Sequence, residues 1–451
     1  MKKIFSIILL LFISTNFLLA EDSNLTLDID KSELKKINII FEDIDYIGDS
    51  GSSKPIDIIL NTIKKNLKTT GLFVIDNTGK SIFDDYEEVK SLSKTDLTNL
   101  VMSKYSQSKV DAVLSGYMEV NNKGEIELKI RLWDILDQRE LFAKYYIIND
   151  ANAKRIGDII SDNIYEPLTG EISGHFDSKI IFVAESGSPK NRIKKIAIMD
   201  FDGSNLHYIT NGKNLVLTPV FSKYSKNEIL YLEYGKYKPN LYQLNLKTNH
   251  LTAIGNPNEM SYAPNFNPNG RNEMVFSATR NGLSNIYKIN FNTKKIDQLT
   301  FDRAISTVPT WSPDGEKILF VSDKTGIRKL YTMNKDGSNV KMISKGRGSY
   351  DKPSWSPDGK LVSFVKMEND IFSIGLMTPK GDSERTIMSA YLVEGIKWSP
   401  NGRYLIYSKQ KGPYGKDSIP GLYTMDILTG LEYKLQTPAN QGATDPDWIK
   451  K

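Results

Sequence analysis

The chain of 451 residues contains no cysteine and only three histidines. It therefore has no disulfide, no thiolate nucleophile and no N-terminal cysteine that could carry a lipid. His175 lies in a glycine-containing stretch, whereas His207 and His250 follow hairpin turns and are expected to be exposed strand residues. The G-x-S-x-G, H-E-x-x-H and phosphate-binding glycine motifs are also absent. We expect no catalytic residues, no metal site and no cofactor.

Strong charge of one sign is absent as well. The sequence has 59 Lys and Arg against 54 Asp and Glu, a formal net charge of +5 that is spread along the chain. A nucleic-acid-binding protein would cluster its basic residues on one face. We therefore expect no nucleic-acid partner. The hydrophobic fraction of 39% is that of a globular protein.

Long apolar runs are missing except at the start of the chain. Two lysines precede an apolar stretch at residues 4–13, which fades towards Ala20, and Glu21 is charged. This pattern is typical of a secretory signal peptide and predicts export. Cleavage between Ala20 and Glu21 would remove residues 1–20. An uncleaved membrane anchor is the alternative, but the run is shorter than the ~20 residues that cross a bilayer.

What the sequence does contain is a repeat. An aromatic residue followed by Ser-Pro-Asp-Gly occurs in residues 309–315 and again in residues 353–359, with related copies elsewhere. The aromatic residues of the five copies stand at positions 221, 266, 311, 355 and 398, which are 45, 45, 44 and 43 residues apart. Periods of about 40–50 residues with β-rich content are typical of propeller blades.

Each repeat has the same internal order. The W-S-P-D-G run reads as a turn, because Pro fixes φ and Gly accepts a positive φ. Further β-rich runs follow, for example residues 317–322 and 330–333, and a D-G-S-N turn leads to a short last strand. Four short strands joined by hairpins make one blade. Turn geometry also explains Asp314, Asp358 and Asn401, for which metal ligation is the alternative.

The repeats are completed by fragments at the two ends of the array. The fragment at residues 180–210 has a second and a third strand but lacks a first, and residues 445–449 supply a first strand alone. The C-terminal strand is therefore predicted to complete this blade. The sequence therefore predicts a six-bladed β-propeller over residues 179–451. Pairing of the C-terminal strand with the first fragment would close the ring and leave no exposed sheet edge where its two ends meet.

Residues 33–168 do not share the period and predict a small α/β domain. Strands are expected at residues 37–41, 72–75, 111–120, 126–132 and 141–148. One helical face is formed by Ile56, Ile59, Leu60, Ile63 and Leu67 and ends at Gly71. A second helix is expected around residues 156–164. Residues 169–178, which include Gly170 and Gly174, are the expected linker.

The order of domains, the W-S-P-D-G and D-G-S-N turns and the closing strand with Trp448 resemble the TolB family of the Tol-Pal system. The resemblance covers nearly all of the chain after the predicted signal peptide. It includes Gly71-Leu72-Phe73 after the first helix, and Leu168-Thr169-Gly170 with Gly174 at the junction. It implies a periplasmic protein that maintains outer-membrane integrity during cell division. The implied partners are the outer-membrane lipoprotein Pal and the inner-membrane protein TolA.

The resemblance also implies two binding surfaces. The first is the N-terminal segment of residues 21–32, where Leu25, Leu27 and Ile29 alternate as in a strand and suit β-strand addition to TolA. The second is one propeller mouth, where Pal docks. We expect the residues just before each Pro-x-aromatic run to ring the channel at this mouth. They are Leu217, Thr218, Met260, Ser261, Thr307, Val308, Tyr350, Asp351, Val393, Glu394, Ala443 and Thr444.

A propeller enzyme, either a lyase or a hydrolase acting on envelope polysaccharide or peptide, is the alternative function. Its active groups would come from several blades, and acids would have to converge at the channel mouth. We expect instead a monomeric, non-enzymatic protein that is peripheral to the membrane through its protein partners.

Overall fold

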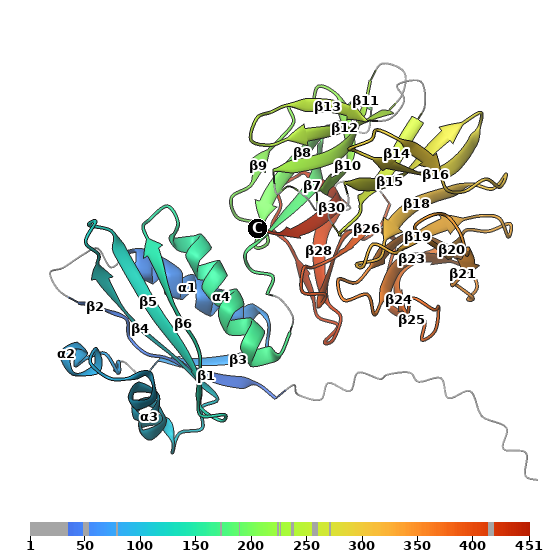
Figure 1. Ribbon diagram of the computed structural model, residues 1–451. Helices are drawn as coiled ribbons and strands as arrows, with labels where there is room; N and C mark the ends of the chain where they lie inside the picture. Colours follow the sequence, from blue (N-terminus) through green and yellow to red (C-terminus); the bar gives the residue numbers. More distant parts are fainter. Residues whose placement is uncertain are drawn as a thin grey trace, which may run out of the picture. The chain divides into compact units, whose positions relative to one another are not determined.

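The computed structural model describes residues 35–47, 54–77, 80–171, 174–188, 190–222, 225, 227–235, 239–254, 260–269, 272–413 and 419–451. The predicted signal peptide, its cleavage site at Ala20 and Glu21, and the segment with Leu25, Leu27 and Ile29 lie outside these residues. The described residues form an α/β domain and a β-propeller (Figure 1). Within the described ranges, no helix has the length and apolar character needed to cross a membrane.

The α/β domain is built on a mixed sheet. Its strands are β1 (Ile37–Phe41), β2 (Asp45–Ile47), β3 (Phe73–Asn77), β4 (Ala112–Val120), β5 (Ile126–Asp134) and β6 (Arg139–Ile148). The strand order is β3-β1-β4-β5-β6, with β2 paired to β4. Strand β1 is parallel to β3 and β4, whereas β4, β5 and β6 form an antiparallel meander. The five predicted strands are all present.

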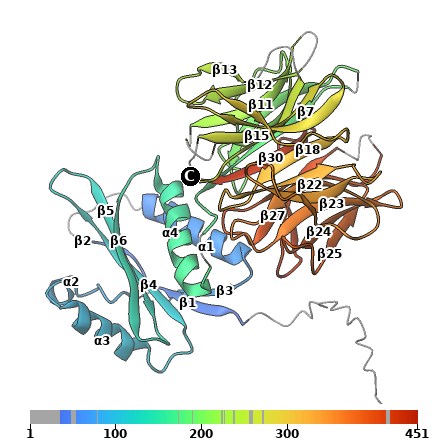
Figure 2. The same ribbon diagram turned by 45° about the vertical axis from the view of Figure 1, so that its right-hand side comes forward.

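Helices cover both faces of this sheet. They are α1 (Lys54–Thr69), α2 (Tyr86–Val89), α3 (Lys94–Tyr105) and α4 (Ala153–Thr169). Helices α1 and α4 lie side by side over one face (Figure 2), where Ile63 and Ile160 join the core. Helix α3 buries Leu97 and Val101 against the other face, beside Trp133. Helices α2 and α3 and strand β2 were not expected from the sequence.

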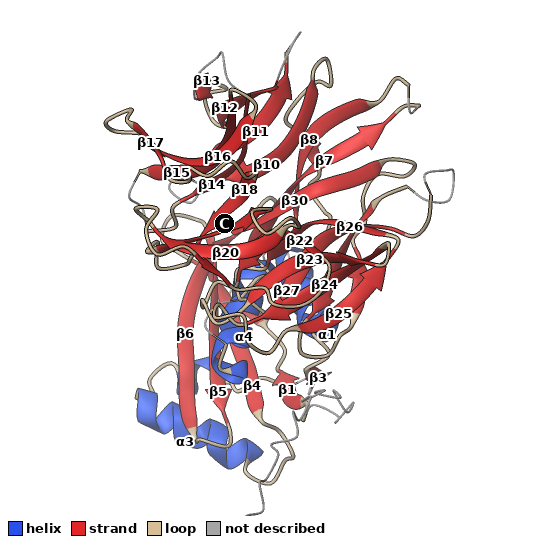
Figure 3. Ribbon diagram, turned by 90° about the vertical axis from the view of Figure 1, so that its right-hand side faces the viewer, coloured by secondary structure: helices blue, strands red, loops and turns tan. Residues whose placement is uncertain are grey.

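The propeller consists of six four-stranded sheets. Figure 3 shows strands throughout the propeller and helices in the α/β domain. The first blade along the ring is β10 (Leu215–Phe221), β11 (Glu228–Tyr234), β12 (Pro239–Asn245) and β13 (Leu251–Ile254), and the second is β14 (Met260–Phe266), β15 (Glu273–Arg280), β16 (Leu283–Asn290) and β17 (Ile296–Gln298). The third is β18 (Ser306–Trp311), β19 (Lys317–Ser322), β20 (Lys329–Asn334) and β21 (Lys341–Met342).

The fourth blade is β22 (Ser349–Trp355), β23 (Val362–Glu368), β24 (Ile371–Met377) and β25 (Arg385–Ala390). The fifth is β26 (Leu392–Trp398), β27 (Tyr404–Gln410), β28 (Gly421–Asp426) and β29 (Glu432–Lys434). The sixth joins the C-terminal β30 (Gly442–Lys450) to β7 (Ser178–Ser186), β8 (Ile193–Asp200) and β9 (His207–Tyr208). This is the predicted closure. The predicted fold class, an α/β domain followed by a six-bladed propeller closed by the C-terminal strand, is confirmed.

The W-S-P-D-G runs are the tight turns between the first and second strands of a blade. In the third blade Asp314 Oδ1 accepts hydrogen bonds from Ser312 Oγ at 2.5 Å and from the backbone N–H of Glu316 at 3.0 Å. Gly315 adopts a φ of 66°, which a residue with a side chain rarely adopts. The carboxylate is thus used within the turn, as the sequence predicted.

Candidate partner-binding face and channel

Every innermost strand carries a β-bulge at the same place. The pairing with the second strand shifts between Leu217 and Val220 in the first blade, and at the equivalent point of the other five. The residue at each bulge has a positive φ of 46–65°. These residues are Thr218, Ala263, Val308, Lys352, Gly395 and Asp445. A non-glycine residue in this conformation costs about 1–2 kcal/mol, and such strain clusters at functional sites.

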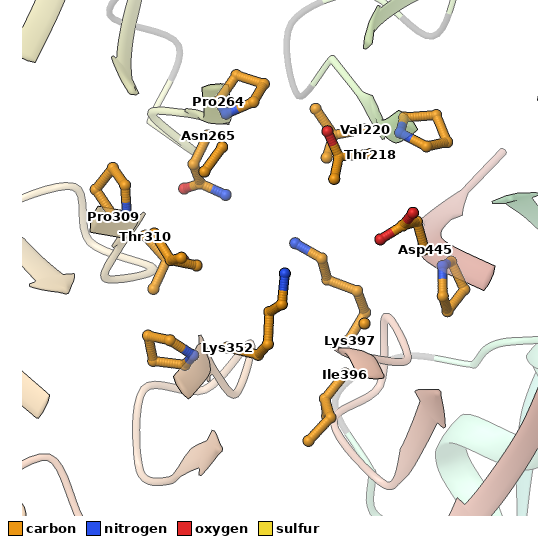
Figure 4. Close-up of a pocket in the computed structure, with 16 residues that line it drawn as sticks. Thr218, Val220, Pro264, Asn265, Pro309, Thr310, Lys352, Ile396, Lys397 and Asp445 are labelled. Carbon is orange, nitrogen blue, oxygen red and sulfur yellow. The ribbon is translucent and has the colours of Figure 1, made fainter. Parts of the chain in front are cut away.

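The six bulges surround a cavity of about 90 Å³ on the propeller axis (Figure 4). Its walls come from every blade: Thr218, Pro219, Val220, Ala263, Pro264, Asn265, Val308, Pro309, Thr310, Lys352, Pro353, Gly395, Ile396, Lys397, Asp445 and Pro446. Lys352 and Lys397 extend their ammonium groups towards the centre of this channel cavity, and Asp445 lies on another wall. The walls between these charges are largely proline and aliphatic.

Of the twelve residues expected from the sequence at the propeller mouth, Thr218 and Val308 line the channel cavity. Tyr350, Val393 and Ala443 are instead core residues with at most 1% of their surface exposed, so their side chains cannot reach a partner without unfolding. Ser261 and Thr444 are also buried. Leu217, Thr307 and Asp351 are half-buried and Glu394 is exposed, whereas the side chain of Met260 lies outside the described residues.

The bulge explains why these expectations missed the channel wall. Successive side chains of a strand point to opposite faces, and one extra residue changes which of them reach the axis. The residues at the cavity are therefore the bulge residue and the two that follow it. A signal was available in the sequence, because five of the six bulge residues directly precede a proline.

The end of the propeller where the innermost strands begin, which we call the start face, exposes large apolar side chains. Because strands alternate in direction, this face also carries the hairpins between second and third strands and the loops between blades. All six blades or their connecting loops contribute. The residues are Ile193, Leu215, Tyr234, Leu283, Phe301, Ile305, Ile327, Met367, Ile371 and Tyr391.

Polar groups lie among these apolar residues of the start face. Arg328 and Asp351 form an ion pair at 2.7 Å between neighbouring blades, and Phe301, in the loop before β18, has 76% of its surface exposed. Exposed aromatic and aliphatic side chains mixed with arginine and hydrogen-bonding groups are typical of protein-binding surfaces. The start face therefore has the chemistry of a protein-docking surface.

Two shifted pKa values belong to a different place, the segment of residues 169–178 that joins the two domains and the helix α4 before it. Burial, helped by the positive charges of Arg403 and Lys450, lowers the pKa of His175 to about 3. Burial raises the pKa of Asp162 to about 6, although its carboxylate accepts hydrogen bonds from the backbone N–H groups of Phe176 and Asp177. These groups hold the backbone of the junction in place.

Comparison with known proteins follows the same division of the chain. Residues 25–141 match the family model described as the TolB amino-terminal domain, and residues 165–451 match the TolB beta propeller domain. The Tol-Pal system protein TolB of Rickettsia bellii is 41% identical, over 99% of each chain. That of Pelagibacter ubique is 36% identical over 196 residues, which are 43% of this chain and 41% of the relative.

Solved structures extend the comparison to the fold. The crystal structure of TolB from Acinetobacter baumannii superposes with a TM-score of 0.72 and covers 92% of this chain and 96% of its own, at 20% sequence identity. That identity supports the fold alone. The two domain matches and the full-length relative show that the chain belongs to the Tol-Pal system protein TolB family.

Proposed function

We propose that this Tol-Pal component works in the periplasm as a connector between two proteins. A Pal-type outer-membrane lipoprotein would bind the start face of the propeller, and a TolA-type inner-membrane protein would bind the segment of residues 21–32. The observation that carries the proposal is the set of exposed apolar side chains on the start face, to which every blade or its connecting loop contributes. Loss of this connection would weaken the outer membrane, most visibly during cell division.

The lipoprotein site is assigned to the start face because it combines apolar anchors with polar groups around a rigid ring. The ring of blades that carries it is held together by strand pairing within blades and by hydrogen bonds between blades, such as the one from the backbone N–H of Trp311 to Asn265 Oδ1 at 2.9 Å. A rigid surface loses little conformational entropy when it binds. A stable complex then requires a few well-buried anchors rather than the whole face.

The TolA-type site rests on sequence alone, because residues 21–32 lie outside the described residues. Leu25, Leu27 and Ile29 alternate as the side chains on one face of a strand do. In β-strand addition the backbone provides affinity and alternate side chains provide specificity. We therefore assign this partner to the N-terminal segment and not to the propeller.

The two assignments are tested with purified partners. The chain from Glu21 onwards and a version that starts at Glu33 are each measured against the soluble domains of the organism's Pal-type and TolA-type proteins. We expect removal of residues 21–32 to abolish TolA-type binding and to leave Pal-type binding unchanged. TolA-type binding at full strength by the shortened chain would refute the N-terminal assignment.

The propeller enzyme is not favoured as a second function. Of the described residues that line the channel cavity, Asp445 is the single carboxylate, and it shares the cavity with Lys352 and Lys397. General acid–base hydrolysis of a glycoside requires a pair of carboxyl groups across the scissile bond. We therefore propose a binding function without catalysis, and an activity screen on cell-wall fragments is expected to detect no turnover.

A further inference from the structure

The connections between strands differ in charge on the two sides of the propeller. On the start face they are the hairpins between second and third strands and the loops between blades. Their described residues include nine lysines and arginines but only three acids, a net charge of +6. On the reverse side, the connections between first and second and between third and fourth strands have seven basic and seven acidic residues among those described. The excess positive charge of the chain, +5 in total, is therefore concentrated on the start face.

Charges on the adjoining strands do not cancel this excess. Strand residues within three positions of the start-face connections include eight basic and seven acidic side chains. Among the acids are Asp351, which pairs with Arg328, and Glu394, which is exposed at the start of β26. The strand ends are thus close to neutral, and the positive charge of the start face comes from its hairpins and loops.

Most of the basic side chains in these connections are open to solvent. Three of the nine form ion pairs at 2.7–3.5 Å, namely Arg192, Arg328 and Lys345. The other six are exposed and form no ion pair within the described part of the chain. They are Lys190, Lys213, Arg303, Lys324, Arg347 and Lys411. These six belong to several blades, so the positive charge is distributed around the ring rather than confined to one loop.

The acids of the start-face connections favour a protein over a lipid surface as the binding partner. Asp302 follows Phe301, which is 76% exposed, and Asp370 precedes Ile371, which is 52% exposed. These apolar side chains would enter a membrane first, and an anionic membrane would repel the carboxylates beside them. A folded protein can instead place a basic or polar group opposite each carboxylate. A net positive surface with interspersed acids therefore fits an acidic protein surface.

We propose that the start face binds an acidic protein surface, which belongs to the Pal-type partner, and that charge acts on the rate of association. This inference rests on the proposed function and adds to it the chemistry of the partner. Long-range attraction guides the encounter of oppositely charged proteins and can raise the association rate constant by about 10- to 1000-fold. The apolar anchors of the start face, once buried, determine the dissociation rate instead.

The test compares two triple variants that remove the same charge from different places. The start-face variant is Lys213→Gln/Arg303→Gln/Arg347→Gln. The reverse-side control is Lys247→Gln/Lys294→Gln/Lys380→Gln. All six side chains are exposed and form no ion pair within the described residues, so we expect both variants to melt at the temperature of the unaltered chain. Because the two variants have equal net charge, a difference between them reports where the charge lies.

Stopped-flow mixing with the purified Pal-type soluble domain measures the association and dissociation rate constants. The two salt concentrations are about 0.01 M and about 0.15 M, where the Debye length is about 30 Å and about 8 Å. We expect the unaltered chain to associate roughly tenfold faster at the lower salt. There the start-face variant should associate at least about threefold more slowly than the reverse-side control, and the dissociation rate constants of the two should agree within about twofold.

The possible outcomes separate this proposal from the proposed function. Equal association rates for the two variants, or a rate that does not depend on salt, would overturn the charge proposal and leave Pal-type binding standing. A rate that increases with salt would also overturn it, because the partner surface would then be basic. No binding by any of the three proteins would contradict the proposed function and this proposal with it.

Sedimentation with vesicles of phosphatidylglycerol and phosphatidylethanolamine at the lower salt tests the lipid alternative. We expect the unaltered chain and both triple variants to remain in the supernatant to the same extent. Vesicle binding that is present in the unaltered chain, lost in the start-face variant and kept in the reverse-side control would assign the positive charge to a membrane surface. That result would overturn the proposal of an acidic protein partner.

Discussion

The indole N–H of Trp448 donates a hydrogen bond to Ser178 Oγ at 2.7 Å, although the two residues are 270 positions apart in the chain. Trp448 lies in the C-terminal strand β30 and Ser178 begins β7, so this bond crosses the seam of the ring. The indole is 96% buried and packs with Ile180 and Tyr404. The propeller is thus closed by side-chain packing as well as by the backbone pairing of β30 with β7.

Replacement of Trp448 by Ala is expected to destabilise the protein by roughly 3–5 kcal/mol, the usual range for a buried tryptophan. Replacement by Phe keeps most of the packing and removes the hydrogen bond, so we expect a loss of roughly 1–2 kcal/mol. Urea unfolding followed by circular dichroism measures both. If Trp448→Ala unfolds at the same urea concentration as the unaltered chain, the seam contributes nothing to stability.

Two glycines near the junction are needed for different reasons: Gly174 because a side chain would not fit, and Gly170 because its backbone is left-handed. A Cβ atom on Gly174 would lie 2.0 Å from Asp162 Oδ1, whereas Gly170 has a φ of 73° and open space around it. We expect Gly174→Ala to cost about 3 kcal/mol, because the buried carboxylate that anchors the junction must move. Gly170→Ala should cost only about 1 kcal/mol for the left-handed conformation. Equal losses in the two variants would mean that Asp162 moves aside freely.

Acid should destabilise the protein partly through His175. The unfolded chain takes up a proton on this histidine near pH 6.5, but the folded protein does so only near pH 3. The stability contributed by the neutral histidine is therefore present above pH 6.5 and is lost as the pH falls, by up to about 1.4 kcal/mol per pH unit. Unfolding at pH 7, 6 and 5 should show a shallower loss for His175→Phe. Parallel curves would contradict this role.

Asp162 should act in the opposite direction. Its pKa is raised from 3.8 to about 6 by burial, so the folded protein binds the proton first as the pH falls. This carboxyl group contributes stability below pH 3.8 that is lost as the pH rises through 6. Asp162→Asn removes that contribution, and we expect its stability to fall more steeply than that of the unaltered chain between pH 6 and pH 4. A curve parallel to that of the unaltered chain would show that Asp162 does not titrate in this range.

The six blades could be predicted from the sequence because turn chemistry is local. Pro, Asp and Gly in W-S-P-D-G fix a turn wherever they stand, and the missing first strand at residue 180 is matched by the extra one around Trp448. Helix α3 was missed because its apolar residues form no clear stripe. The sequence does indicate where α3 begins, because Ser93 is a typical N-cap residue, and its Oγ accepts a hydrogen bond from the backbone N–H of Asp96.

The channel wall could not be predicted by the same means. Whether Thr307 or Thr310 reaches the axis depends on the bulge at Val308, which is a feature of strand pairing and not of residue type. The prediction that the twelve mouth residues bind a partner remains untested, but Tyr350, Val393 and Ala443 are buried. Exposed residues of the start face are therefore the better positions for testing partner binding.

The affinity of the purified Pal-type soluble domain for the double variant Ile327→Arg/Ile371→Arg tests whether this partner binds the start face. These residues lie at hairpins of neighbouring blades on the start face and are 48% and 52% exposed. The matched control is Met342→Arg/Tyr433→Arg, on the outer strands β21 and β29, where both residues are 44% exposed. Because all four side chains are exposed, we expect the melting temperatures to stay within the scatter of the unaltered chain.

Calorimetric titration of the three proteins should give at least tenfold weaker binding for the start-face variant, which corresponds to about 1.4 kcal/mol, and unchanged binding for the control. Binding of the start-face variant at full affinity, or an equal loss in the control, would contradict the assignment of the partner to the start face.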